Sequence, residues 1–320
     1  MRTVSRVFRG ISVISVVIFC AVTVMPAHGV QDLLVSSYES GEVLRYDGET
    51  GAFIGVFTSG GPFLGPKGLA YGPDGNLYVG DDYVGVQRYN GVTGAFIDTF
   101  ASYSGIEQVQ GIVFGPDGNL YVSCSVENDI EFVGVMRFNG VTGAFIDTFT
   151  SGGALWEPRG LGFGPDGNLY VSNIGTNGVL RYDGSTGAFI DTFASGGGLD
   201  GPLGLVFGPD DNLYVSSSAT DQVLRYDGGT GAFIDTFASG SGLDGPYGVV
   251  FGPDGNLYVS SSQPNPLTEK VLRYDGITGA FIDEFASGLD EPTYLLFIPE
   301  SGTMVLIGLG GLVLLRKRRS

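Results

Sequence analysis

Histidine and cysteine are almost absent from this sequence. The chain has one histidine, His28, and two cysteines, Cys20 and Cys124. His28 and Cys20 lie in an N-terminal segment that we expect to be removed on export, as argued below. The rest of the chain then has no imidazole for a general base, a Ser-His-Asp triad or a zinc site, and Cys124 has no disulfide partner. We therefore assign no catalytic residue, and we expect Cys124 to be a small buried core residue.

Basic residues are also scarce. The chain has 16 Lys and Arg against 34 Asp and Glu, which gives a net charge of −18. Seven of the 16 cations lie at the two ends, three within residues 1–10 and four within residues 316–319, so only nine lie between them. A field of this sign repels phosphate groups. We therefore predict that nucleic acid is not a partner, and that neutral polymers or cations suit this surface better.

The N-terminal segment has the three parts of a secretory signal peptide. Residues 1–10 contain three arginines, residues 11–25 form an apolar stretch, and Ala27 and Gly29 are small residues spaced two apart. This order is typical of the basic region, the apolar region and the cleavage site of an exported protein. We predict a signal peptide over residues 1–29 and export of the chain.

The C-terminal segment has a short apolar run followed by basic residues. Thr303–Leu315 spans 13 residues. As a helix this run reaches about 20 Å, which is short of the roughly 30 Å hydrocarbon core of a bilayer. The positive-inside rule predicts that the basic residues 316–319 stay in the cytoplasm.

With its Pro299-Glu300 dipeptide, its short Gly/Leu-rich run and its basic end, this segment resembles the PEP-CTERM sorting signal of Gram-negative bacteria. Ser301 stands where that motif has its second proline. The resemblance implies that residues 299–320 form a sorting segment, that an exosortase-like enzyme is a partner, and that the tail contacts the membrane at least transiently. It also implies a location at the cell envelope, the cell surface or the extracellular matrix. A simple membrane tail anchor is the alternative.

The body between these ends is built from one repeated unit. Gly-Pro-Asp-Gly-Asn-Leu-Tyr-Val begins at residues 72, 115, 164 and 252, a variant begins at residue 208, and Thr-Gly-Ala-Phe-Ile occurs six times. A period of 43 to 49 residues predicts a propeller or a solenoid. Because no part of the body has helical apolar periodicity, a solenoid of helix pairs is excluded.

Each unit contains four short apolar segments separated by polar turns. In one unit these are residues 204–207, 213–215, 223–226 and 232–235, a pattern typical of one antiparallel sheet. The body begins with a second strand at residues 32–36 and ends with a first strand at residues 293–297, so the two termini complete one blade. We predict an all-β fold over residues 30–298. It is a six-bladed β-propeller with four antiparallel strands per blade, closed by its N- and C-terminal strands.

These repeats resemble those of NHL-repeat propellers. That family has a Pro-x-Gly-apolar-x-apolar segment, which is Pro202–Phe207 here. It also has an Asp-Gly-Asn-apolar-Tyr-Val segment, which is Asp254–Val259 here. The resemblance implies the fold far more than a function. Streptogramin lyases and paraoxonases have similar repeats but need catalytic histidines, whereas gluconolactonase-like propellers hold a channel metal with Glu, Asn and Asp.

Differences among the six units indicate where a ligand binds. The turns after the first and third strands repeat almost unchanged, whereas the loops after the second strands carry long insertions at residues 123–134 and 260–270. These loops share one face of a propeller with the connections between units, and ligands favour varied loops on a rigid scaffold. Sequence drift in unused loops is the alternative. The predicted ligand-binding residues on this face are Lys67, Gln110, Trp156, Arg159, Tyr247 and Thr293.

Two further patterns are interpreted as structural. In five units an arginine of the third strand is opposite an aspartate of the fourth, while Arg45 is opposite Gly55; we expect cross-strand ion pairs rather than a catalytic series. Trp156 either stacks on a sugar ring or forms a hydrophobic plug under its own loop. The acidic loop residues Glu127, Asp129, Glu131, Asp81 and Asp82 have no EF-hand spacing and are interpreted as solvated charge.

Two functions remain open. The leading hypothesis is an exported binding scaffold for an extracellular polysaccharide, a matrix protein or another envelope component. The alternative is a Ca²⁺-dependent, gluconolactonase-like hydrolase that uses the propeller channel. The acidic residues near the channel mouth that would hold this metal are Glu107, Asp200, Asp244 and Asp290.

Overall fold

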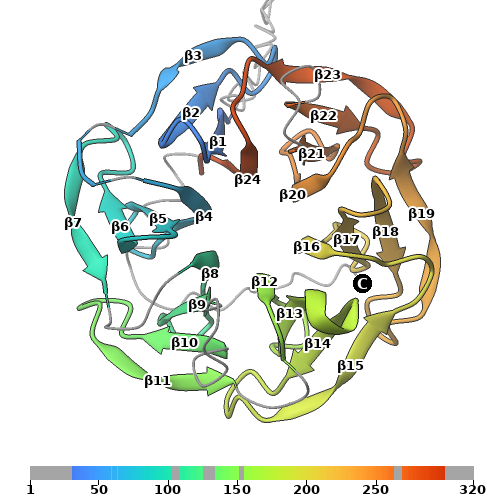
Figure 1. Cartoon of the computed structure of the whole chain (residues 1–320), viewed down its shortest axis with the longest axis horizontal. Coiled ribbons are helices and arrows are strands. Elements are labelled where there is room, and N and C mark those ends of the chain that lie inside the picture. Colours follow the sequence, from blue (N-terminus) through green and yellow to red (C-terminus); the bar gives the residue numbers. More distant parts are fainter. Residues whose placement is uncertain are drawn as a thin grey trace, which may run out of the picture.

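The computed structural model describes residues 31–58, 60–62, 64–102, 108–124, 134–150, 155–262 and 269–299. Six four-stranded antiparallel sheets stand around a central axis, and the first strand of each sheet lies nearest to that axis (Figure 1). The predicted six-bladed β-propeller is therefore confirmed. Residues 1–29 and 300–320, which carry the two predicted targeting segments, lie outside the described ranges. Within those ranges, no helix is long and apolar enough to cross a membrane.

The blades are numbered here in chain order, with the innermost strand first. Blade 1 contains β24 (Pro292–Phe297), β1 (Leu33–Ser37), β2 (Glu42–Tyr46) and β3 (Phe53–Val56). Blade 2 contains β4 (Pro66–Tyr71), β5 (Leu77–Asp81), β6 (Gly85–Tyr89) and β7 (Phe96–Ala101). Blade 3 contains β8 (Val109–Phe114), β9 (Leu120–Cys124), β10 (Gly134–Phe138) and β11 (Phe145–Thr150).

The other three blades repeat this order. Blade 4 contains β12 (Pro158–Phe163), β13 (Leu169–Asn173), β14 (Gly178–Tyr182) and β15 (Phe189–Ser195), with the short 3-10 helix η2 (Ile174–Thr176) after β13. Blade 5 contains β16 (Pro202–Phe207), β17 (Leu213–Ser217), β18 (Gln222–Tyr226) and β19 (Phe233–Ser239). Blade 6 contains β20 (Pro246–Phe251), β21 (Leu257–Ser261), β22 (Lys270–Tyr274) and β23 (Phe281–Ser287).

The two ends of the body close the ring in blade 1. Strand β24 pairs with β1, so that Leu33 is opposite Phe297 and Leu34 is opposite Leu296. The Ile298 amide extends this pairing by donating to the Asp32 carbonyl at 2.9 Å. This pairing covers the inner edge of β1 and the outer edge of β24, as the closure prediction required.

A buried tyrosine in the second strand joins each of blades 2 to 6 to its neighbour. Tyr214 is 1% exposed, and its ring lies edge-to-face against Phe237 of the same blade and Phe251 of the next, with centroids 4.8 and 4.9 Å away. Such aromatic pairs contribute roughly 0.5–1.5 kcal/mol beyond area burial. The other tyrosines at this position are Tyr78, Tyr121, Tyr170 and Tyr258. Cys124 is buried in the core, as predicted.

The predicted cross-strand ion pairs are confirmed in five blades. Arg225 pairs with Asp235 at 2.6 Å, and the pairs of Arg88, Arg137, Arg181 and Arg273 have the same form at 2.5–2.6 Å. In blade 1, where Gly55 replaces the aspartate, Arg45 turns to Asp32 instead, at 2.5 Å. The guanidinium of blade 1 therefore has a different environment from its five counterparts.

Candidate functional site

Each inner strand has a β-bulge near its start. In β20, Pro246 pairs with Ser261 and Val249 pairs with Val259, so two residues of β20 lie opposite the single residue Ser260. The other five inner strands shift register at the same place. A β-bulge re-aims side chains out of the alternating pattern of a strand. Five of the six predicted ligand-binding residues lie in these bulges: Lys67, Gln110, Arg159, Tyr247 and Thr293.

A serine of the second strand fixes the bulge. Ser216 Oγ accepts a hydrogen bond from the Gly204 amide at 2.8 Å and donates one to the Tyr247 carbonyl of the next blade at 2.7 Å. Ser36, Ser123 and Ser260 donate to the neighbouring inner strand in the same way. This positioning role was not predicted from the sequence, although the serine recurs directly after the second-strand valine.

Two predicted residues from distant parts of the sequence meet across the channel. The Tyr247 hydroxyl donates to Gln110 Oε1 at 3.0 Å. Their strands, β20 and β8, lie on opposite sides of the axis (Figure 1), so this hydrogen bond spans the ring. Burial raises the pKa of Tyr247 to about 12. Its hydroxyl is therefore protonated at neutral pH and acts as a donor.

Lys67 lies beside this bond and already has an anionic partner. Its ammonium is 2.7 Å from Asp82 Oδ2 and 4.9 Å from the centre of the Tyr38 ring. Burial lowers the pKa of Lys67, while the charge of Asp82 opposes that shift. Asp82 also accepts a long hydrogen bond from Gln110 Nε2 at 3.5 Å, so the carboxylate links two of the predicted residues.

Three buried side-chain donors have no hydrogen-bond partner among the described residues: Arg159 Nε, Ser172 Oγ and the Tyr294 hydroxyl. Arg159 and Tyr294 belong to the inner strands around the channel. Tyr294 stands where the other inner strands have a glycine, and its ring lies edge-on to Tyr247 with centroids 5.4 Å apart. Arg159 reaches Glu157 with a terminal nitrogen at 3.4 Å, but its Nε is not used. A buried donor without a partner typically costs about 1–3 kcal/mol, so these two groups favour a ligand that brings oxygen acceptors.

The last two predicted residues occupy different environments. Thr293 is 3% exposed, and its hydroxyl donates to the Pro66 carbonyl at 3.4 Å, so it joins blade 1 to blade 2 rather than facing solvent. Trp156 is 54% exposed, and its backbone amide donates to Asn173 Oδ1 at 2.6 Å. The hydrophobic-plug interpretation of Trp156 is wrong. Gly175, in η2, packs against Cβ and the adjacent edge of the Trp156 indole, Cγ and Cδ1, and about half of this tryptophan stays exposed.

The backbone before the inner strands is strained on this face. Glu157 and Glu291 have φ of 52° and 45°, in the left-handed region. At the same place blades 5 and 6 have Gly201 and Gly245, which adopt such angles without strain. Non-glycine residues held in this region are concentrated at functional sites.

Three of the four predicted calcium ligands lie within the described ranges. Asp200, Asp244 and Asp290 stand at the same place before the inner strands of blades 5, 6 and 1. Asp200 Oδ1 accepts from the Asn177 side chain at 2.9 Å, which is a contact between loops. Over the described ranges, no three His, Cys, Asp or Glu side chains form a group that could hold a metal ion. Glu107 and the acidic loop residues 127–131 lie outside those ranges, so a site that includes Glu107 stays a prediction.

A hollow of about 370 Å³ lies on the same face, at the junction of blades 6 and 1. Its polar lining includes Ser37, Glu42 and Asp290, and its apolar lining includes Tyr46 and Phe53. The face that carries the loops after the second and fourth strands, called the loop face here, therefore combines a polar channel mouth with a second concave surface at its rim.

Comparisons with known proteins agree on the fold and identify no family. No protein-family model and no curated protein matches this chain. A protein of unknown function from Bacteroides caccae has a similar structure, with a TM-score of 0.65 and 16% sequence identity over 84% of this chain and 99% of that chain. A chain of a nidogen/laminin complex matches with the same TM-score and identity over 84% of this chain and 98% of that chain. At 16% identity, these similarities show the fold alone.

Proposed function

We propose that this protein is an exported, NHL-type propeller that binds an extracellular polysaccharide at its loop face. The observation that carries this proposal is that two of the channel residues that differ from blade to blade, Arg159 and Tyr294, each have a buried donor without an acceptor among the described residues. Hydroxyl and ring oxygens of a sugar are suitable acceptors. A binding role is also supported by the similar chain from a nidogen/laminin complex.

The charge and the aromatic residues of the face indicate the chemical class of the sugar. The chain carries a net charge of −18, which disfavours a polyanionic polymer. The exposed indole of Trp156 offers a flat apolar surface on which a sugar ring can stack. A neutral polysaccharide is therefore the ligand class that we expect.

A glycan array printed with neutral and acidic oligosaccharides, followed by calorimetry with the best binder, tests the proposal. Changing Trp156, Arg159 and Tyr247 to alanine should weaken binding by about 1–3 kcal/mol for each residue that contacts the sugar. The matched control changes Glu49, Ser185 and Ile277 to alanine on the opposite turns. Equal loss in the two sets, or no binding to any neutral glycan, would contradict the proposal.

The Ca²⁺-dependent hydrolase makes a different prediction for the same protein. A channel metal would raise the melting temperature when CaCl₂ is added, by mass action on the folded state. Asp200→Asn, Asp244→Asn and Asp290→Asn would each reduce this rise, and gluconolactone would be hydrolysed faster in the presence of Ca²⁺. A Ca²⁺-dependent rise together with this hydrolysis would favour the enzyme over the binding scaffold.

The targeting segments complete the proposal and have their own test. We expect residues 1–29 to direct export, and the PEP-CTERM-like residues 299–320 to be processed by an exosortase-like enzyme, which releases the propeller to the cell surface or matrix. Deleting residues 301–320 should leave a soluble propeller in the periplasm. Full-length protein that remains in the inner membrane with its C-terminus intact would instead support a simple tail anchor.

A further inference from the structure

Blade 1 lacks one carboxylate that the other five blades all have. In blades 2 to 6, an aspartate of the outermost strand binds the arginine of the adjacent strand through two hydrogen bonds, as Asp191 binds Arg181 at 2.6 and 3.1 Å. In blade 1 the residue paired with Arg45 is Gly55. A Cβ placed on Gly55 would meet no heavy atom within 4 Å, so the space of the missing side chain is open.

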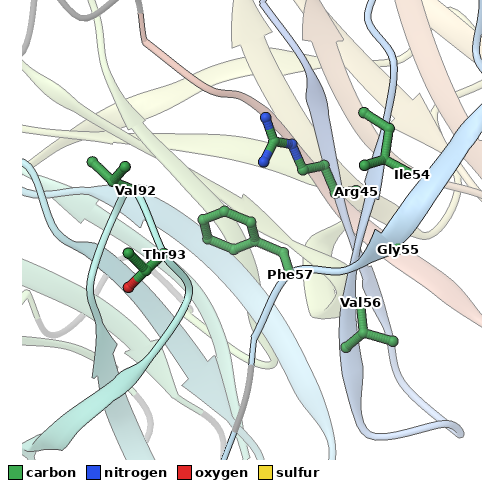
Figure 2. Close-up of a pocket in the computed structure, with 7 residues that line it drawn as sticks. All are labelled: Arg45, Ile54, Gly55, Val56, Phe57, Val92 and Thr93. Atoms are coloured by element: carbon green, nitrogen blue, oxygen red, sulfur yellow. The ribbon is translucent and has the colours of Figure 1, made fainter.

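A hollow of about 170 Å³ lies at this position, between blade 1 and the turn of blade 2 (Figure 2). Figure 2 shows the Phe57 ring between the Arg45 guanidinium and the pair Val92 and Thr93. Ile54 and Val56 complete the lining and are about half exposed, at 51% and 48%. One end of the hollow is thus cationic, and Phe57 and Val92 contribute apolar surface beside it.

Arg45 keeps donors available on this side. Its Nε and one terminal nitrogen both bind the single oxygen Asp32 Oδ2, at 2.7 and 2.5 Å. No other hydrogen-bond acceptor contacts the guanidinium within the described ranges. The Arg45 side chain is 36% exposed, whereas the five paired arginines are 18–21% exposed. A guanidinium presents five N–H donors in a planar fork that matches a carboxylate.

We propose that this hollow binds a small organic acid, whose carboxylate takes the place of the missing aspartate opposite Arg45 and whose apolar body lies against Phe57 and Val92. The carboxylate of the ligand would pair with Arg45 in the geometry that the aspartate and the arginine have in the five other blades. The size also fits, because an engineered apolar cavity of roughly 150 Å³ in another protein holds benzene. The site is on the face that carries the turns after the first and third strands, called the turn face here. This face is opposite the proposed polysaccharide site, and the proposal does not depend on that site.

The probe for this site is 4-fluorobenzoate, followed by ¹⁹F relaxation as it is titrated into the full-length protein. We expect one saturable site, and binding about tenfold weaker or more in Arg45→Gln. The matched control is Arg181→Gln in blade 4, whose guanidinium is already occupied by Asp191; it should bind like the wild type. The neutral analogue 4-fluorobenzamide should bind more weakly than the acid, because it cannot pair with the guanidinium as an ion.

Two substitutions at the aspartate position sharpen the test. Gly55→Asp supplies an internal carboxylate and should abolish binding. Gly55 has φ of 158°, which aspartate adopts less readily. The folding of the Gly55→Asp variant must therefore be checked by circular dichroism. Asp98→Gly removes the carboxylate beside Arg88 in blade 2, where Phe100 packs under the next turn as Phe57 does in blade 1. This variant should gain a second site of similar affinity.

Three results would overturn the proposal. They are equal affinity of the wild type and Arg45→Gln, unchanged stoichiometry in a folded Asp98→Gly variant, and equal binding of the acid and the amide. Self-association that depends on Arg45, seen by sedimentation in the absence of the probe, would assign the hollow to an acidic side chain of a second copy instead. The sugar-binding variants Trp156→Ala and Tyr247→Ala should bind 4-fluorobenzoate normally, which separates this site from the proposed function.

Discussion

The two faces of the propeller hold their carboxylates in opposite ways. On the turn face, hydrogen bonds from the threonine three residues later lower the pKa of the aspartate that begins each of four turns: Asp47, Asp183, Asp227 and Asp275. On the loop face, burial and neighbouring carboxylates raise the pKa of Glu269 and Glu291. These four ionised aspartates therefore stabilise the fold, whereas ionised Glu269 and Glu291 destabilise it.

This difference indicates that the repeated turn-face aspartates serve folding. The hydrogen bonds between the turn aspartate and the threonine three residues later recur in blade after blade, as expected of residues kept for stability. The loop face instead combines repelling carboxylates, left-handed Glu157 and Glu291, and donors without acceptors. Features that lower stability are typical of surfaces where binding is the requirement. The predictions below test whether the two faces differ in this way.

The largest effect is expected for Tyr214, whose hydroxyl end belongs to the turn face. Tyr214→Ala removes a fully packed ring between Phe237 and Phe251 and should lower the free energy of unfolding by about 3–5 kcal/mol. Tyr214→Phe keeps the ring and loses only the 3.0 Å hydrogen bond to Asp210, a loss of about 1 kcal/mol. Unfolding in urea measures both changes.

The matching control on the loop face is Trp156→Ala. Because the indole is 54% exposed, this substitution should change the free energy of unfolding by less than about 0.5 kcal/mol. A loss comparable to that of Tyr214→Ala would mean that the loop face contributes to packing as much as the turn face does, and the distinction drawn here would fail.

The repeat allowed the sequence to predict the fold. Six copies of the same turns and strands specify one blade six times, and the unmatched strands at the two ends leave ring closure as the way to pair them. The arginine–aspartate pairs followed from the same comparison, because residues in equivalent strands must share a register. Local pattern was sufficient for these features.

The site was predicted only in part, because it depends on distances across the ring. The predicted ligand-binding positions of the inner strands were recognised, but the bulge that turns them follows from the register with the second strand, and the Tyr247–Gln110 bond depends on the diameter of the closed channel. Tyr294 in the place of a glycine is visible in the repeats, yet its unpartnered hydroxyl is a property of the packing. For Trp156 the sequence left two interpretations open, a sugar-stacking ring and a hydrophobic plug, because its exposure depends on how Gly175 packs against it.

An intermediate effect is expected when the turn-face aspartates are neutralised by acid. Their folded pKa values lie below the ordinary 3.8, so their contribution is complete above that pH and is lost as the pH falls through the folded values. The melting temperature should therefore fall in the window below about pH 4. Asn90 and Asn139 accept the same turn hydrogen bonds in blades 2 and 3, so asparagine fits this position.

The variant that tests this window changes Asp47, Asp183, Asp227 and Asp275 to asparagine together. Its melting temperature at pH 7 should stay close to that of the wild type, and its decrease between pH 5 and pH 3 should be smaller. An equally steep decrease would show that these four carboxylates do not carry the acid sensitivity of the turn face.

The smallest effect is expected for Glu291 on the loop face. Burial, and then the charges of Glu39, Glu269 and Asp290, raise its pKa above the ordinary 4.5. A carboxylate with a raised folded pKa contributes stability below its ordinary pKa and loses it as the pH rises, so ionised Glu291 destabilises the fold at pH 7. Glu291→Gln should increase the free energy of unfolding at pH 7 by less than about 1 kcal/mol after solvent screening. Melting curves at pH 7 and pH 4 measure this gain, which should shrink at the lower pH because the wild-type residue is then largely protonated. Glu49→Gln on the turn face is the matched control and should produce no gain. A decrease in stability for Glu291→Gln at pH 7 would show that this carboxylate supports the loop face, and the two faces would then no longer differ in how they hold their charges.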